Sequence, residues 1–246
     1  MPTLLLSSRQ TDDAQKLWSA CIAENWKVIR LHGWRVPEIS THDVVVYGEP
    51  LFAQHVAQTL GLRLLEPAVD WLPKLPCRWR ARRVQLATLA EARKVSTCSF
   101  IKPAEEKCFE ARVYSSGAEL PAPGPLPEDL PVLVQEVVDW AREFRCFVLD
   151  RKVVTSSAYW RDGQPAKSED GSWSASGAEL EEANRFCEKV LQDQTVPLPN
   201  AVAVDVGLIQ NRGWAVIECN AAFGAGICGC DPVEVLRVLR NTCAPL

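Results

Sequence analysis

Three polar side chains interrupt the strongly apolar stretch from Ala201 to Asn220. Two runs rich in β-branched residues flank Asn211-Arg212-Gly213, and such a break is typical of a hairpin. If its loop holds two or four residues, antiparallel pairing puts Asp205 opposite Glu218 or Asn220 on one face, because strand side chains alternate with a period of two. Two carboxylates and an amide oxygen would then converge.

The chemistry of these three residues indicates a divalent cation. An ionised carboxylate inside an apolar strand is costly unless a cation offsets its lost hydration. Oxygen ligands without His or Cys suit Mg²⁺ or Mn²⁺, which bind through one or two carboxylates together with substrate phosphates. The alternative is that each is a strand-end residue that meets water or an arginine. Three on one expected face favour the metal, with Asp205, Glu218 and Asn220 as its ligands.

Other charged residues earlier in the chain complete a possible site for a nucleoside triphosphate. Cations for phosphate, strand backbone for a base and anions for a metal are its usual parts. The sequence has neither a P-loop signature nor the glycine-loop and catalytic-loop motifs of protein kinases. The candidates in chain order are Lys102, Lys107, Gln135, Glu136 and Arg145.

The first part of the chain predicts a small βαβ-type layer. Its expected strands are Thr3 to Leu6, Lys27 to Leu31 and Val44 to Tyr47, and its expected helices begin after Thr11 and run from Pro50 to Leu60. No glycine-rich loop follows these strands, so a self-sufficient nucleotide site is not expected there. Prolines between Trp71 and Arg83 indicate a domain junction.

Strands and helices also alternate in the second part. The expected elements are a strand and helix in Val84 to Lys94, a hairpin of Ser99 to Ile101 with Ala111 to Ser115, a strand from Val132 to Val138, a hairpin from Glu143 to Tyr159, and helices at Ala178 to Leu191 and Asp231 to Leu239. A two-residue turn at Asp150-Arg151 would put Arg145 opposite Ser156. Trp160 to Ser176 is rich in Gly, Ser and charge, which favours a mobile loop.

This order of parts resembles the ATP-grasp superfamily, and most closely the clade named after one arginine and two lysines. The likeness covers roughly Arg78 to Leu239. Its most specific piece is Asp205 with Glu218-Cys219-Asn220, which is similar to the metal-binding strands of the ribosomal-protein glutamate ligase branch. Phe100-Ile101-Lys102-Pro103 resembles the family's phosphate-binding lysine strand, and Glu143-Phe144-Arg145 its arginine-bearing strand.

The resemblance implies an α/β (α+β) fold in which two sheets sandwich ATP. It implies a small N-terminal pre-ATP-grasp domain over residues 1–75, a small subdomain over 76–138 and a large subdomain with the metal site over 139–246. The expected ATP-binding residues are Arg83, Lys102, Lys107, Gln135, Glu136, Val137, Val138, Asp139 and Arg145, of which Lys102 and Arg145 are also expected to act in catalysis.

Each of these residues has a role that the resemblance implies. Lys102 would touch the α- or β-phosphate with Lys107 beside it, and the backbone of Gln135 to Val138 would pair with adenine. Glu136 or Asp139 would be available for the exocyclic amine or the ribose. Arg145 would neutralise the γ-phosphate and an acylphosphate, while the predicted metal ligands would hold two Mg²⁺ ions. Either Arg82 or Arg83 would supply the clade's arginine.

One feature departs from the wider superfamily. Ala104 to Ala111, where a glycine-rich loop is usual, contains no glycine. Gly224-Ala225-Gly226 could instead give backbone amides access to substrate.

The leading hypothesis is an ATP-dependent carboxylate-amine ligase that acts on small-molecule or peptide substrates through an acylphosphate. A second hypothesis is an ATP-binding or sensing module without turnover, and a third is a phosphotransferase on the same scaffold. A soluble α/β protein without a nucleotide site is the general alternative.

Composition excludes several other classes of protein. The chain has 246 residues and a net charge of -4, which gives no electrostatic footprint for nucleic acid. Apolar runs are too short to cross a bilayer and Leu4 to Leu6 is too short for a signal peptide, so a cytoplasmic protein without membrane partners is expected. The ten cysteines are scattered, and the histidines His32, His42 and His55 lie far from most of them, which favours reduced cysteines over zinc. The sequence gives no prediction of oligomeric state.

Overall fold

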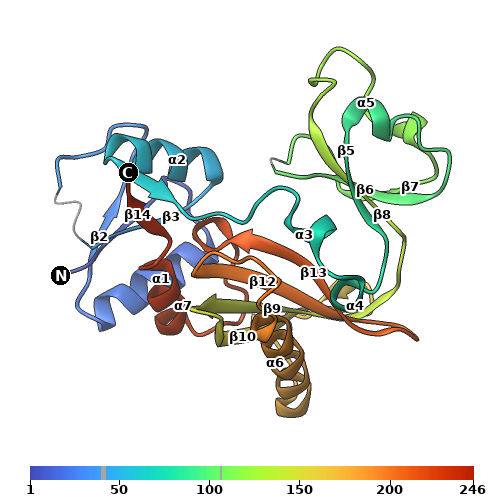
Figure 1. The fold of residues 1–246 in the computed structure, drawn as a ribbon. Coiled ribbons are helices and arrows are strands. Elements are labelled where there is room, and N and C mark those ends of the chain that lie inside the picture. The colour runs from blue at the N-terminus through green and yellow to red at the C-terminus, as the bar shows by residue number, and fades with distance from the viewer. Residues whose placement is uncertain (40–42, 106) are drawn as a thin grey trace.

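The computed structural model describes residues 1–39, 43–105 and 107–246 (Figure 1). His42 lies outside the described residues, as does residue 106 of the glycine-free segment. The chain forms three main layers: an N-terminal parallel sheet, a small antiparallel sheet and a larger antiparallel sheet between them.

The N-terminal layer matches the predicted elements closely. Its members are β1 (Thr3–Leu6), α1 (Asp12–Ala23), β2 (Lys27–Arg30), β3 (Val44–Tyr47) and α2 (Pro50–Thr59). The strands pair in parallel in the order β2-β1-β3. The Thr11 side chain accepts a hydrogen bond from the Ala14 backbone N–H at 3.1 Å, which explains why α1 begins there.

The end of the chain returns to this layer. Strand β14 (Cys243–Pro245) pairs antiparallel with β4 (Leu62–Leu64). Helix α7 (Pro232–Leu239) shares a core with β1 and α1, and Asp231 caps it as its sequence predicts. Figure 1 accordingly places the red and blue parts of the chain together.

The small sheet follows two short helices, α3 (Trp71–Lys74) and α4 (Cys77–Arg80), in the predicted junction. Its elements are β5 (Val84–Thr88), α5 (Leu89–Ala92), β6 (Ser99–Pro103), β7 (Arg112–Tyr114), the 3₁₀ helix η1 (Gly117–Glu119) and β8 (Pro131–Gln135), with the antiparallel order β5-β8-β6-β7. Strand β8 ends three residues before the predicted end at Val138. Its partner β5 begins only at Val84, opposite Gln135, so the ladder has no strand to continue on.

The large sheet has the antiparallel order β11-β10-β9-β12-β13. Its elements are β9 (Trp140–Leu149), β10 (Lys152–Arg161), β11 (Gln164–Pro165), α6 (Gly177–Gln192), β12 (Ala201–Ile209) and β13 (Gly213–Ala221), followed by the 3₁₀ helix η2 (Ala222–Gly224). The segment expected to be a mobile loop therefore contains the end of β10 and all of β11.

Two irregularities set the register of this sheet. Asp150 and Arg151 form the predicted tight turn with φ values of 47° and 60°, but a bulge between Val153 and Thr155 shifts the following pairs. Arg145 therefore lies opposite Ser157, and the predicted pairing with Ser156 is wrong.

The second irregularity lies in the β12–β13 hairpin. Ile209 pairs with Gly213, so the loop has three residues instead of the two or four considered. A bulge at Ile217 then compensates by one residue, and Asp205 lies opposite Glu218. The predicted pairing is thus confirmed although the route to it differs.

Strand β12 is buried on both faces, which accounts for its continuous apolar sequence. The face with Val202, Val204 and Val206 packs in a core with α6. The opposite face contributes Ala203 to the core of the N-terminal layer and, one step further along, carries Asp205. The site therefore begins where the N-terminal core ends.

Among the described residues, no helix combines the length and the apolar character needed to cross a membrane.

Candidate functional site

A buried ion pair lies at the centre of the large sheet. Asp205 is 0% exposed on β12, and strand register places it beside Arg145 of β9. The Arg145 guanidinium donates from Nε to Asp205 Oδ1 at 2.9 Å and from Nη2 to Oδ2 at 2.7 Å. This is the bidentate geometry that makes arginine-carboxylate pairs strong and directional.

Glu218 extends the cluster towards the small sheet. Its Oε1 accepts a hydrogen bond from Asn220 Nδ2 at 2.9 Å, and its Oε2 forms an ion pair with Lys102 Nζ. Asn220 Nδ2 also lies 3.4 Å from Asp205 Oδ2. Because Lys102 comes from β6, the cluster joins the two antiparallel sheets.

Burial and charge act against each other in this cluster. Burial alone would raise the pKa of Glu218, but the Lys102 ammonium and the Asn220 amide lower it to about 2. Burial raises the pKa of Asp205, and the Arg145 guanidinium opposes that rise. Burial lowers the pKa of Arg145, but the Asp205 carboxylate more than offsets this, so the guanidinium stays charged.

The donor set fits a hard divalent cation. The described residues contain no group of three or more His, Cys, Asp or Glu side chains arranged to hold a metal. Asp205, Glu218 and Asn220 nevertheless bring two carboxylates and one amide together, and Mg²⁺ typically takes one or two carboxylates and completes its shell with phosphate and water. Lys102 and Arg145 are the cations that contact these carboxylates in the structure.

The predicted adenine segment connects the two sheets. Gln135 is buried at the end of β8, and Glu136 Oε1 binds Arg212 at 2.8 Å. The Asp139 carbonyl accepts a hydrogen bond from the Gln210 N–H at 2.9 Å. Val137 is exposed, and Val138 is half-buried. The segment is therefore anchored to the large sheet at Glu136 and Asp139.

The two candidates for the clade's arginine have opposite environments. The Arg83 side chain is 87% exposed and lies 3.9 Å from Glu136. Arg82 is buried, with Nε and Nη2 donating to Gln135 Oε1 at 3.2 and 2.9 Å. Burial lowers the pKa of Arg82 to about 10, so it remains charged at neutral pH.

Lys107 is exposed in the loop after β6. The structure does not bring it into the carboxylate cluster, so its predicted role beside Lys102 stays a prediction.

Sequence reasoning gave no role in the site to two residues beside Arg145. Tyr159 donates its hydroxyl to Glu143 Oε2 at 2.5 Å, and the Arg145 guanidinium lies 5.4 Å from the centre of the Tyr159 ring. Burial raises the pKa of Glu143. Glu143 was expected only as part of the arginine-bearing strand, although its spacing of two residues from Arg145 puts both side chains on one face. Tyr159 could not be found from spacing, because a bulge between Ala158 and Trp160 determines where it lies.

A loop after β13 connects Arg145 to the N-terminal layer. The Gly226 carbonyl accepts from Arg145 Nη1 at 2.9 Å, and the Ile227 N–H donates to Asp13 Oδ2 at 3.0 Å. The Tyr47 hydroxyl donates to the Ala225 carbonyl at 3.1 Å. Asp13 was recognised only as a polar residue of a helix start, and nothing in its sequence context shows this contact.

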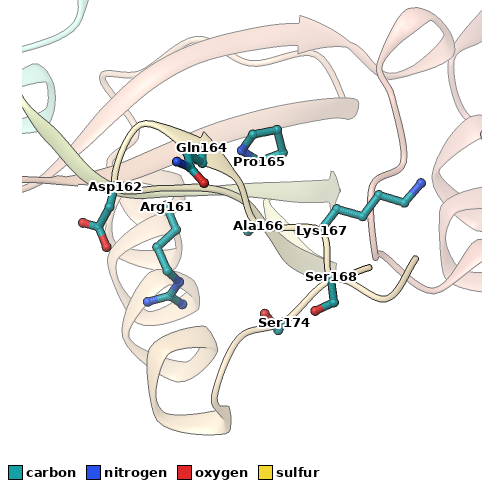
Figure 2. A pocket seen from close by; sticks show the side chains of 8 residues that line it. All are labelled: Arg161, Asp162, Gln164, Pro165, Ala166, Lys167, Ser168 and Ser174. Atoms are coloured by element: carbon teal, nitrogen blue, oxygen red, sulfur yellow. The ribbon is translucent and has the colours of Figure 1, made fainter. Parts of the chain in front are cut away.

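Figure 2 shows a surface hollow beside the end of β10 and β11. Arg161 on its wall binds both carboxylate oxygens of Glu179, at 2.8 and 2.9 Å. Lys167 pairs with Asp12 of α1 at 3.2 Å. The hollow is formed by the segment after β10, and Lys167 ties that segment to the N-terminal layer. Its lining residues are Arg161, Asp162, Gln164, Pro165, Ala166, Lys167, Ser168 and Ser174.

Comparison with solved structures supports the fold assignment. A RimK domain ATP-grasp protein from Sphaerobacter thermophilus DSM 20745 is 15% identical, with a TM-score of 0.59, and the match covers 98% of this chain and 99% of that one. A D-alanine–D-alanine ligase from Bacillus anthracis, solved in complex with ATP, is 14% identical with a TM-score of 0.50, over 98% and 96% of the two chains. At these identities the likeness shows the fold.

No curated protein matches the sequence. Residues 79–238, well over half of the chain, match the model of an ATP-grasp domain, family 2 of the clade named after one arginine and two lysines. The expected α/β ATP-grasp fold is therefore confirmed, and the chain belongs to family 2 of this ATP-grasp clade.

Proposed function

We propose that this protein is an ATP- and Mg²⁺-dependent carboxylate-amine ligase that forms an amide or peptide bond through an acylphosphate. The observation that carries the proposal is the cluster of Lys102, Glu218, Asn220, Asp205 and Arg145. Its two cations and three oxygen-bearing side chains come from both antiparallel sheets and meet at one place. This is the combination that phosphoryl transfer requires.

The small sheet supports a base-binding role beside the same cluster. Its register places Lys102, Leu133 and Leu86 on one face, and Phe100 and Val113 on that face as well. The contact of Lys102 with Glu218 turns this face towards the large sheet. Leu86 is 39% exposed and Val113 is 43% exposed, so apolar surface is available for an adenine ring to cover.

The chain's own residues have distinct tasks in the proposed reaction. Lys102 binds an α- or β-phosphate, and Arg145 offsets charge on the γ-phosphate and on the acyl group that receives it. Bound Mg²⁺, held by Asp205, Glu218 and Asn220, supplies further neutralisation of phosphate charge. The substrate carboxylate attacks the γ-phosphorus of ATP and ADP leaves, which gives the acylphosphate. The amine then attacks the acylphosphate carbonyl, phosphate leaves, and the amine proton passes to phosphate or water, so no protein nucleophile is needed.

The substrate end is proposed to lie towards the N-terminal layer. The hollow in Figure 2 and the contact of Lys167 with Asp12 support an acceptor pocket shaped by residues 160–176 and α1. The solved D-alanine–D-alanine ligase is an example of a carboxylate-amine ligase on this fold.

A second candidate is an ATP-binding module without turnover. The glycine-free segment after Lys102 favours it, because a glycine-poor loop closes less readily over a γ-phosphate.

ADP release tests the proposal. Purified protein with Mg-ATP is assayed against pools of amino acids, other carboxylates and peptides, beside an Asp205→Asn, Glu218→Gln double variant. Glu234→Gln serves as the matched control, since Glu234 lies on α7 and pairs only locally with Arg237. We expect turnover that needs both a carboxylate and an amine and that disappears in the double variant alone.

The other outcomes separate the alternatives. Mg²⁺-dependent ATP binding in calorimetry without turnover in any pool would favour the binding module. A stable phosphorylated product formed without an amine would favour a phosphotransferase. Absence of nucleotide binding would refute the assignment.

A further inference from the structure

Arg82 is saturated by protein acceptors. A guanidinium has five N–H donors. Nε and one Nη2 hydrogen go to Gln135 Oε1 at 3.2 and 2.9 Å, and the other Nη2 hydrogen goes to the Ile217 carbonyl at 3.0 Å. The Nη1 hydrogens go to the carbonyls of Val216 at 2.7 Å and Arg80 at 3.1 Å. With all five donors engaged, none is left for a phosphate.

Two of these acceptors lie at the bulge that orients Glu218. Val216 and Ile217 come directly before Glu218, and the bulge at Ile217 is what places Glu218 opposite Asp205. Without the bulge, Ile217 would lie opposite Asp205 and Glu218 would point to the other face of the sheet, because a shift of one residue reverses side-chain direction. Arg82 thus binds the irregularity on which the carboxylate pair depends.

The remaining acceptors and the packing around Arg82 connect this bulge to the small sheet. Gln135 is the last residue of β8, directly before the segment that joins the two sheets. The Arg82 guanidinium also lies 5.0 Å from the centre of the Trp140 ring. Trp140 in turn packs over Gly207, where an added Cβ would lie 2.7 Å from its Cε3. The guanidinium is held between the ends of both sheets.

We propose that Arg82 is a positioning residue and not a phosphate ligand: it fixes the β13 bulge so that Glu218 faces Asp205, and it ties that bulge to Gln135. The test of this inference by ATP binding rests on the proposed nucleotide and metal site. Its test by hydrogen exchange does not depend on that site.

The structural test is hydrogen exchange of the protein without nucleotide. Arg82→Gln and Arg82→Lys remove the planar fork, and Lys keeps the charge. We expect both to increase amide exchange in β13 and in residues 135–139. Arg237→Gln is the control, because the Arg237 side chain is 61% exposed and pairs with Glu234 on α7, away from β13 and residues 135–139. Unchanged exchange in folded Arg82→Lys would overturn the proposal.

The functional test compares ATP binding with Mg²⁺ and with chelator in calorimetry. Misplacing a metal ligand should weaken Mg-ATP binding in Arg82→Lys by about tenfold more than it weakens metal-free ATP binding. A smaller loss of metal-free binding would reflect the loosened 135–139 segment. Equal weakening in both conditions would overturn the proposal.

A double variant tests whether Arg82 affects metal binding through Glu218. In a Glu218→Gln background the Arg82→Lys change should weaken Mg-ATP and metal-free ATP binding equally, because the metal ligand that it positions is already lost. A further loss confined to Mg-ATP binding would contradict the proposal. If the wild type binds no ATP, the proposed function fails, and the exchange measurement still decides the role of Arg82.

Discussion

The two ion pairs of the site are built differently. Arg145 and Asp205 lie on neighbouring strands of one sheet, and their side chains are 14% and 0% exposed. Lys102 and Glu218 come from different sheets, and theirs are 20% and 27% exposed. Strand register alone fixes the first pair, whereas the second depends on how the two sheets lie relative to each other.

Because of this difference, the first ion pair contributes more to stability, and the second can exchange its partners more easily. Opening the Arg145–Asp205 pair leaves a carboxylate with no access to water, which is strongly unfavourable. Opening the Lys102–Glu218 pair leaves two partly hydrated groups that can take new partners. The proposed phosphate and metal contacts therefore form first at the second pair. The contacts proposed for Arg145 and Asp205 need their pair to loosen, which the charges of a bound metal and phosphate would favour.

The difference in stability between the two ion pairs should be largest when Arg145 is replaced. Arg145→Met leaves the Asp205 carboxylate buried without its cation, so we expect the free energy of unfolding to fall by about 3–5 kcal/mol. Urea denaturation followed by tryptophan fluorescence measures it. Adding Asp205→Asn should recover part of the loss. A loss below about 1 kcal/mol, as for an exposed pair, would contradict the assigned difference.

In Glu218→Gln we expect a small loss of stability and a large loss of ADP release. Because Lys102 keeps part of its hydration, the free energy of unfolding should fall by less than in Arg145→Met, by about 1–3 kcal/mol. Mg²⁺-dependent ADP release should fall by about 10²-fold, since a charge that stabilises phosphoryl transfer is lost. Equal effects on turnover in Glu218→Gln and in the α7 control Glu234→Gln would refute this expectation.

Gly207 tests how tightly the register-fixed side is packed. In Gly207→Ala the new Cβ would lie 2.7 Å from Trp140 Cε3 and 2.9 Å from the Arg142 carbonyl. We expect a loss of about 1–3 kcal/mol in unfolding free energy from this overpacking. Gly177→Ala is the control, because no atom lies within 4 Å of its added Cβ. A neutral Gly207→Ala would show that Trp140 moves freely.

Glu179 offers a third arrangement, since one carboxylate that is 17% exposed binds both Arg142 and Arg161 of one sheet. Hydrogen bonds from Arg161 and from the Ser176 backbone lower the pKa of Glu179 in the folded state. The stabilisation that the Glu179 carboxylate gives to the folded state is therefore fully present above its unfolded-state pKa. This stabilisation is lost as the pH falls through the lower folded-state pKa. We expect Glu179→Gln to reduce stability by about 1 kcal/mol at pH 7.

Thermal unfolding from pH 7 downwards measures this contribution. The difference between the wild type and Glu179→Gln should shrink as the solution is acidified below about pH 4. A difference that grows on acidification would contradict the assignment.

Local sequence signals predicted the elements well, because caps and periodicity act over a few residues. Thr11 and Asp231 cap the helices expected of them, and Asp205 faces Glu218. Bulges escaped prediction, since a one-residue insertion at Ile217 leaves an apolar run apolar. The bulge that places Arg145 opposite Ser157 likewise has no signal in the sequence.

Long-range contacts were the other gap. Arg82 was expected only as one of two candidates for the clade's arginine, and its contacts were not foreseen, because its acceptors at Val216 and Ile217 lie 134 and 135 residues away. No local pattern distinguishes a guanidinium that binds a ligand from one that binds backbone carbonyls.

The contact between Asp13 and the Ile227 N–H has a kinetic consequence. The two residues are 214 positions apart, so the loop that supplies the Gly226 carbonyl to Arg145 closes only after both ends of the chain have met. Contacts of such separation form late, since their loop-closure entropy must be offset by structure already present. Refolding should restore the sheets before it restores the surroundings of Arg145.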